Sequence, residues 1–90
     1  MYIMNESHQK KAELLKALGH PIRYCIVEGL LQGQQNVLTM THCVGVPQPT
    51  VSQHISILKS AGIIKGERNG NSISYSVCNK EVAEIIKIFG

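Results

Sequence analysis

The sequence predicts a mainly α-helical fold of five helices with one two-stranded β-hairpin. Apolar residues recur at helical spacing up to about residue 62. The period then changes to two between residues 63 and 77, as is typical of strands, and helical spacing returns near the end of the chain. A chain of 90 residues has room for one hydrophobic core, so we expect a single domain over residues 1–90.

The first two helices are predicted from their boundaries and their apolar stripes. Asn5 or Ser7 can cap a helix that ends at Gly19. Pro21, at the first helical position, opens a second helix that runs to about Gln32. The stripes consist of Ala12, Leu14, Leu15, Ala17 and Leu18 in the first helix and of Ile22, Ile26, Val27, Leu30 and Leu31 in the second. The broader face places the second helix at the centre of a small core.

Residues 37–60 have the pattern of two short helices joined by a tight turn. Gly45 can take a positive φ after the first of these helices, and Pro49 suits the first turn of the second, which begins at Gln48. The apolar positions are Val37, Leu38, Met40, Cys43 and Val44 before the turn and Val51, Ile55, Ile57 and Leu58 after it. Two short helices joined by a glycine-containing turn are the skeleton of a helix-turn-helix.

The second helix of this pair has a polar face without a carboxylate. Its polar residues are Gln48, Thr50, Ser52, Gln53, His54 and Ser56. A solvated helix face normally carries Glu as well as Lys, whereas amides, hydroxyls and an imidazole suit base edges and phosphate oxygens. This face alone is equally compatible with a plain solvated surface, so the rest of the chain has to decide between the two interpretations.

The segment after Gly62 has the pattern of a β-hairpin. Asn69-Gly70 is a strong signal for a tight turn between two strands. The return strand alternates Ile73, Tyr75 and Val77 with Ser72, Ser74 and Ser76. One face of the hairpin is therefore expected on the core and the other in water. The tip, Arg68 to Asn71, is polar and basic.

The last helix is predicted to begin after Asn79, which can act as its cap, with Glu81 in the first turn. Its apolar seam consists of Val82, Ile85, Ile86 and Phe89. We expect that no element of so small a domain is left to cover this seam, and that it packs on the first helix of a second subunit. The alternative is packing against the first helix of the same chain.

Three segments, taken in order, resemble the motifs of the ArsR family of small bacterial repressors. They are KALGHPIRYCIVEGL, VPQPTVSQHISILKSAGII and RNGNSISYSV, which are similar to the family's opening segment, recognition helix and wing. The resemblance covers about residues 12 to 89. It implies a winged helix-turn-helix that forms a homodimer through its first and last helices, binds double-stranded operator DNA and represses transcription.

The resemblance also indicates which residues contact DNA. The helix from Gln48 to Ser60 would enter the major groove, and the wing tip would touch the backbone or the minor groove. The residues expected on DNA are Gln48, Thr50, Ser52, Gln53, His54, Lys59, Arg68 and Asn71. Many members have Ser where Pro47 stands, so the first-turn N–H groups of this helix are expected to be left for water or a phosphate. Two-fold symmetry predicts an inverted-repeat operator.

The metal sites of the family are not present in this sequence. Many members bind a metal through a Cys pair on the helix before the recognition helix, or through Asp/His pairs on the last helix. The corresponding positions here hold Asn36, Val37 and Leu38 in the first place and Asn79 and Glu81 in the second. We therefore expect no metal and no cofactor. The short flanking helices and the ending NKEVAEIIKIF resemble the PagR-type branch of the family.

The three cysteines leave one alternative function open. Cys25, Cys43 and Cys78 are odd in number and far apart, without a CxxC motif, so neither a disulfide framework nor a zinc module is indicated. The helices that carry Cys25 and Cys43 can approach each other, and a thiol-based redox-sensing repressor using these three cysteines is one alternative. A winged-helix protein-interaction module without DNA binding is the other.

Composition and charge exclude several classes of protein. The net charge of +3 permits nucleic-acid binding without demanding it. No long apolar run that could span a membrane occurs, and the N-terminal segment lacks an apolar signal core, so a cytoplasmic location is expected. The sequence has no Ser/His/Asp grouping, phosphate-binding loop or cluster of carboxylates, and we expect no enzymatic activity.

Overall fold

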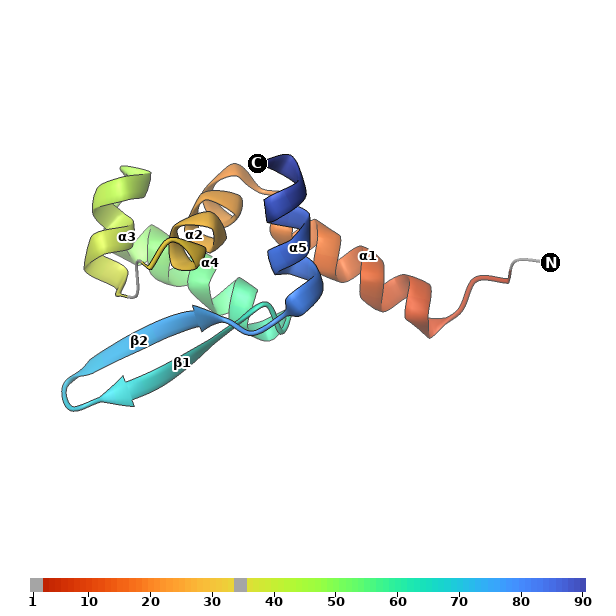
Figure 1. Cartoon of the computed structure of the whole chain (residues 1–90). Coiled ribbons are helices and arrows are strands. Elements are labelled where there is room, and N and C mark those ends of the chain that lie inside the picture. Colours follow the sequence, from red (N-terminus) through yellow and green to blue (C-terminus); the bar gives the residue numbers. More distant parts are fainter. Residues whose placement is uncertain (1–2, 34–35) are drawn as a thin grey trace.

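The computed structural model describes residues 3–33 and 36–90. In chain order these residues form α1 Glu6–Leu18, α2 Pro21–Leu31, α3 Val37–Val44, α4 Gln48–Ser60, β1 Ile64–Asn69, β2 Ser72–Val77 and α5 Lys80–Phe89 (Figure 1). The two strands pair antiparallel as a hairpin. The five helices and two strands predicted from the sequence are confirmed, and α4 has the predicted bounds.

Side chains cap α1, α2, α3 and α5 at their N-termini. Asn5, His20, Asn36 and Asn79 each accept a hydrogen bond from a backbone N–H in the first turn of the helix that follows. Pro47 stands at this position before α4, where no side-chain cap is formed. The missing side-chain cap agrees with the sequence, but few N–H groups are left for water or a phosphate. Pro49 has no N–H, and the Thr50 N–H donates to the Pro47 carbonyl at 3.0 Å, so only the Gln48 N–H remains.

The core lies where α2, α3 and α4 meet the base of the hairpin. α2 contacts α1, α3, α4 and β2, as expected for the helix with the broadest apolar face. The largest fully buried side chains are Ile26, Val27, Met40, Val51, Leu58, Ile63 and Val82. Because burial of one such side chain stabilises a fold by about 1.5–3 kcal/mol, these residues fix α2 and α4 relative to each other.

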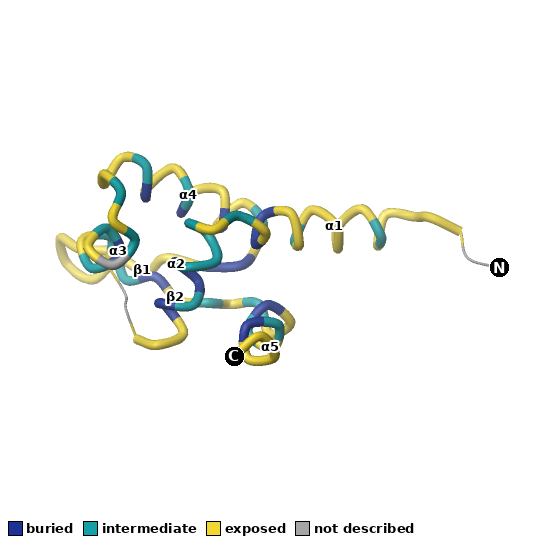
Figure 2. Tube along the Cα trace, turned by 90° about the horizontal axis from the view of Figure 1, so that it is seen from above, coloured by how far each residue is buried: buried dark blue, intermediate teal, exposed yellow. Residues whose placement is uncertain are grey.

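Three leucines that were predicted on buried stripes are exposed instead. Leu15, Leu31 and Leu38 are 55%, 41% and 75% exposed. Leu15 lies on α1, which projects from the body of the molecule so that only its last two residues are buried (Figure 2). Leu31 is the last residue of α2, and Leu38 lies about 200° around α3 from the buried Met40. In each case the stripe is narrower than the sequence pattern indicated.

The expectation that the seam of the last helix has nothing to cover within its own chain is wrong. Val82 and Ile86 are 0% and 6% exposed and belong to the core. The reason is the path of the chain after β2, where Cys78 N–H donates to the Ile63 carbonyl at 2.9 Å and α5 turns back beside the body (Figure 1). Only the C-terminal end of the seam faces outward, with Phe89 74% exposed.

The hairpin turn lies one residue later than the Asn69-Gly70 signal. Asn69 pairs with Ser72, so Gly70 and Asn71 form the turn. Gly70 has a φ of +65°, and no other type of residue has a positive φ in the described ranges, which matches a turn with glycine first. Tyr75 is buried at the base of the hairpin, whereas the tip extends past the core and is exposed on both faces.

Candidate nucleic-acid interface

The turn between α3 and α4 has the geometry that the sequence predicted. Gly45 ends α3 with a φ of +77°, and its N–H donates to the Thr41 carbonyl at 2.9 Å. Glycine reaches this conformation without the steric cost of a Cβ atom. Because α3 and α4 pack against each other across this turn, the two helices form a helix-turn-helix unit.

α4 turns one side to the core and the opposite side to solvent. Val51, Ile55 and Leu58 are 0%, 3% and 0% exposed. At 100° per residue, Gln53 lies nearly opposite this buried stripe. Among the residues expected on DNA in α4, the exposed ones are Gln48, Ser52, Gln53 and Lys59, and the half-buried ones are Thr50 and His54. The outer surface of α4 therefore carries amides and hydroxyls on a helix that the core holds in place.

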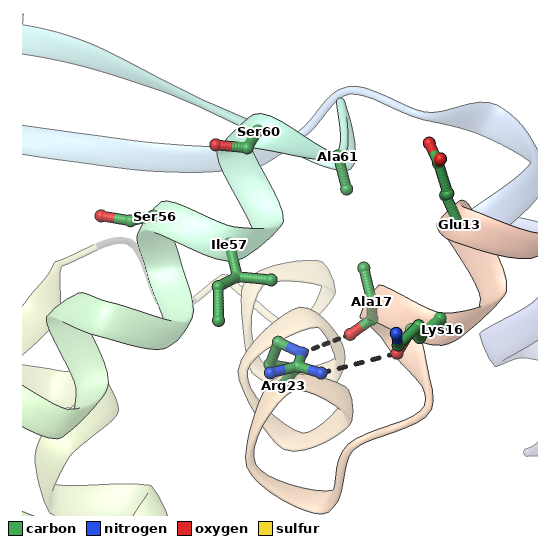
Figure 3. A pocket seen from close by; sticks show the side chains of 8 residues that line it. All are labelled: Glu13, Lys16, Ala17, Arg23, Ser56, Ile57, Ser60 and Ala61. Atoms are coloured by element: carbon green, nitrogen blue, oxygen red, sulfur yellow. Dashed lines mark hydrogen bonds between the residues drawn. The ribbon is translucent and has the colours of Figure 1, made fainter. Parts of the chain in front are cut away.

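A hollow of about 550 Å³ lies beside the outer surface of α4 (Figure 3). Its lining consists of Glu13, Lys16, Ala17, Arg23, Ser56, Ile57, Ser60 and Ala61. Ile57 is 43% exposed and lies along α4 between Ser56 and Ser60. The structure thus adds Ile57 and Ser60 to the outer surface, where Ser56 was expected, and places an apolar side chain within it.

His54 does not point simply into solvent. Its Nδ1 lies 3.2 Å from Nη1 of Arg23, and its ring centroid lies 4.6 Å from that of His20. The pKa of His54 is lowered from its ordinary value by partial burial first, and then by the charges of His20 and Arg23. The His54 side chain therefore joins α4 to the N-terminal turn of α2, and its neutral form is favoured.

Arg23 is a residue of this region that sequence reasoning did not single out. Its guanidinium also donates from Nε to the Ala17 carbonyl and from Nη2 to the Lys16 carbonyl, the latter at 3.5 Å (Figure 3). Arg23 thus joins the end of α1 to the middle of α4. The only local signal is its position two residues after Pro21 at the start of α2, and nothing in the sequence places it beside His54.

The region around the helix-turn-helix is free of carboxylates over a long stretch. No Asp or Glu occurs between Glu28 and Glu67, and this stretch includes α3, α4 and the start of β1. Glu67 itself forms an exposed ion pair with Lys65 at 3.6 Å. α4 itself therefore adds no negative charge that would repel phosphates, although Glu13 of α1 lines the hollow beside it.

The hairpin carries the remaining residues expected on DNA. Arg68 and Asn71 are both exposed at the tip. Within the described parts of the chain, Arg68 forms no ion pair, because the cations of the salt bridges are Lys65 and Lys87. Its charge is therefore available to an external anion. The tip is held by its own side chains, since Asn69 Nδ2 donates to Ser74 Oγ at 2.9 Å.

The thiols and possible metal ligands are scattered. Cys25 is half-buried on α2, and Cys78 is exposed with its Sγ 3.5 Å from the Gly62 carbonyl oxygen. The side chain of Cys43 lies outside the described residues. Among the side chains that the structure describes, no group of three His, Cys, Asp or Glu is arranged to hold a metal ion. None of the described helices is both long enough and apolar enough to cross a membrane.

The fold and the exposed surface together define a winged helix-turn-helix protein, with α4 as the recognition helix and the hairpin as the wing. The chain belongs to the ArsR family. Residues 20–65 match the family model described as bacterial regulatory protein, arsR family.

Known relatives agree with this assignment. The chain is 43% identical over 74 residues to the HTH-type transcriptional repressor SmtB of Mycobacterium tuberculosis, a match that covers 82% of this chain and 55% of that protein. The chain therefore spans about half the length of SmtB. It is 39% identical over 83 residues to the transcriptional repressor PagR of Bacillus anthracis, covering 91% of this chain and 83% of PagR.

Solved structures confirm the fold. The crystal structure of PagR superposes with a TM-score of 0.84 at 37% identity, covering 94% of this chain and 98% of that one. The solution structure of the homodimeric winged helix-turn-helix domain of Mb0332 from Mycobacterium bovis superposes with a TM-score of 0.84 at 25% identity. The match covers 99% of this chain and 86% of that one. The resemblance to the ArsR family that the sequence indicated is confirmed.

Proposed function

We propose that this protein is a DNA-binding transcriptional repressor that acts as a homodimer on an inverted-repeat operator. The observation that supports this most is the outer surface of α4, which is exposed, free of carboxylates and held rigidly by the core within a helix-turn-helix. Relatives of this chain are named as transcriptional repressors. Membership in a family of bacterial transcription regulators favours a binding protein over an enzyme. It also favours a cytoplasmic location, where bacterial DNA lies.

In this proposal α4 lies in the major groove. Gln53 faces away from the core and can pair with N6 and N7 of adenine, a bidentate contact worth about 1–3 kcal/mol of discrimination. The Gln48 N–H at the start of α4, which has no side-chain cap, is suited to a phosphate; Pro49 has no N–H and the Thr50 N–H donates to the Pro47 carbonyl. The side chains of Gln48, Thr50 and Ser52 extend this phosphate-binding end, and Lys59 adds a positive charge in the last turn of the helix.

The wing supplies electrostatic contacts in this proposal. Arg68 is exposed at the end of a hairpin that extends past the core, with Asn71 on the other side of the turn. A guanidinium at the end of such an arm can reach a phosphate or the minor groove. We assign Arg68 and Asn71 to backbone positioning and not to reading of bases.

The homodimer follows from apolar surface on α1 and α5. α1 has 13 residues, of which only Ala17 and Leu18 are buried, and a helix with so little packing is marginal alone. The exposed apolar residues near this surface are Ile3, Met4, Leu15, Ile88 and Phe89. A second copy that covers them would stabilise α1 and present two recognition helices, roughly 34–36 Å apart for adjacent major grooves.

The dimer can be tested by sedimentation equilibrium. Leu15→Ser and Phe89→Ser should shift the protein toward monomer, because each removes apolar area from the proposed interface. Leu38→Ser is the matched control, since Leu38 is equally apolar and 75% exposed but lies on α3. An unchanged dimer in both interface variants, or a monomeric wild type, would contradict the proposed interface.

The two alternative functions gain no further support. A redox sensor needs a thiol pair, and Cys25 and Cys78 are free thiols, one half-buried and one exposed. An interaction module without DNA binding does not account for an outer surface of α4 that lacks carboxylates. That residues 1–90 form one domain stays a prediction.

Fluorescence anisotropy tests the proposed function directly. The wild-type protein is titrated into labelled duplex from upstream of its own gene and into a shuffled duplex of the same composition, at one fixed salt concentration. We expect roughly a thousandfold or greater preference for the specific duplex. Equal affinity for both duplexes would contradict a sequence-specific repressor at this site.

A further inference from the structure

Arg23 occupies a position between three helices. From α2, its Nε and Nη2 donate to the carbonyls of Ala17 and Lys16 at the end of α1, as the dashed lines in Figure 3 show. Its Nη1 lies 3.2 Å from Nδ1 of His54 on the recognition helix. The guanidinium is therefore fixed by α1 while it contacts His54, which the sequence analysis places among the residues expected on DNA.

The chemistry of this contact determines where the His54 proton lies. A guanidinium has only N–H donors, keeps its charge at all relevant pH values and accepts no hydrogen bond. Nδ1 of His54 must therefore accept, and a neutral imidazole that accepts at Nδ1 carries its proton on Nε2. We propose that Arg23 is a positioning residue that holds His54 as a neutral Nε2–H donor directed to DNA.

The surroundings of His54 agree with a neutral ring. The titratable and charged groups that face it are Arg23 on α2 and His20 at the N-terminus of α2. His20 is held in place by the start of α2, since its Nδ1 lies 3.1 Å from the Ile22 backbone nitrogen. Partial burial and these neighbours lower the pKa of His54, which keeps a second positive charge away from the guanidinium.

A donor fixed in this way suits an acceptor on DNA. Nε2–H can donate to a phosphate oxygen or to N7 or O6 of guanine, whereas the other tautomer presents a lone pair that DNA acceptors repel. This inference rests on the proposed function for its consequence on DNA, but the tautomer itself is a property of the free protein. The two can therefore be tested separately.

The first experiment uses wild-type protein without DNA. Long-range ¹H–¹⁵N NMR spectra at neutral pH distinguish the two tautomers and the protonated ring, and the His54 signals are identified by their loss in His54→Gln. We expect the Nε2–H form. A ring protonated on Nδ1, or on both nitrogens, at neutral pH would overturn the proposal. If wild type binds no DNA specifically, the proposed function fails while this result still decides the role of Arg23.

The second experiment removes the guanidinium. In Arg23→Met, the pKa of His54 should rise when followed by NMR titration, and operator affinity should fall about five- to tenfold, the loss of one well-placed hydrogen bond. In the His54→Gln background, the same substitution should change affinity by less than about twofold. If the loss of affinity in the double variant equalled the product of the two single losses, Arg23 would act independently of His54 and the proposal would be overturned. A His54 pKa that does not change in Arg23→Met would overturn it as well.

A matched control separates charge from positioning. Lys16→Met removes one positive charge from the same hollow without touching His54, since only the Lys16 backbone contacts Arg23. Its effect on affinity should be the same in wild type and in His54→Gln. If the effect of Lys16→Met on affinity also disappeared in the His54→Gln background, as expected for Arg23→Met, the cause would be a general charge effect. That result would overturn the specific role of Arg23.

Discussion

The recognition helix and the wing are held in place by different means. α4 is fixed by the core, because Val51, Ile55 and Leu58 are almost completely buried. The hairpin is held mainly by its own strand pairing, since every residue from Lys65 to Ile73 is exposed. A rigid helix can present hydrogen-bonding groups at fixed distances, as base reading requires, whereas an exposed arm is suited to long-range charge interactions. The two regions therefore predict different responses to substitution.

The largest expected difference is in stability. Leu58→Ala removes a side chain with 0% exposure from the anchored face of α4 and should lower the free energy of unfolding by about 2–5 kcal/mol. Ile73→Ala, on the return strand of the wing, should cost within about 1 kcal/mol because Ile73 is already 38% exposed. Urea unfolding followed by circular dichroism measures both. Similar losses would contradict the view that the core anchors α4 but not the wing tip.

The next difference concerns sequence preference. Gln53→Ala should weaken binding to the operator by about 1–3 kcal/mol and leave binding to shuffled DNA nearly unchanged, because it removes a base contact and no charge. Gln32→Ala, an exposed glutamine at the end of α2, is the control and should change neither affinity. Anisotropy titrations on both duplexes give the answer. An equal loss of affinity for the operator and for shuffled DNA would mean that Gln53 contacts the DNA backbone and not a base.

The wing should respond in the opposite way. Arg68→Ala should weaken binding to all sequences alike and reduce the slope of log affinity against log salt by about one, since it removes one phosphate contact. Lys80→Ala removes the same charge from the exposed start of α5 and should leave the slope unchanged. A salt titration in which Arg68→Ala keeps the wild-type slope would contradict a role of the wing in DNA contact.

Local chemistry explains which parts of this fold could be predicted from the sequence. The boundaries of α4 were predicted because Gly45, Pro47 and Pro49 act on the residues beside them. The same holds for the hairpin, although its turn moved by one residue, because the register also depends on contacts such as that of Asn69 with Ser74.

Long-range packing explains the parts that could not be predicted. The burial of Val82 depends on the path of the chain between β2 and α5, and no local sequence signal determines this path. The contact of Arg23 with His54 joins residues 31 positions apart, so His54 looked like an exposed side chain of a polar helix. The residues expected on DNA lie along α4 and on the wing, with His54 turned to Arg23, and their contacts with DNA stay predictions.

The smallest expected effect is a pH dependence that belongs to α4 and not to the wing. The pKa of His54 is lower in the folded protein than the ordinary value of 6.5, so the unfolded chain binds more protons as the pH falls. The stabilisation from neutral His54 is therefore complete above about pH 6.5 and is lost as the pH falls through the lowered pKa. Urea unfolding of wild type and His54→Gln between pH 8 and pH 5 isolates this contribution from the other histidines. Wild type should lose more stability than the variant on acidification, and parallel curves would mean that the contacts of His54 with Arg23 and His20 do not favour its neutral form.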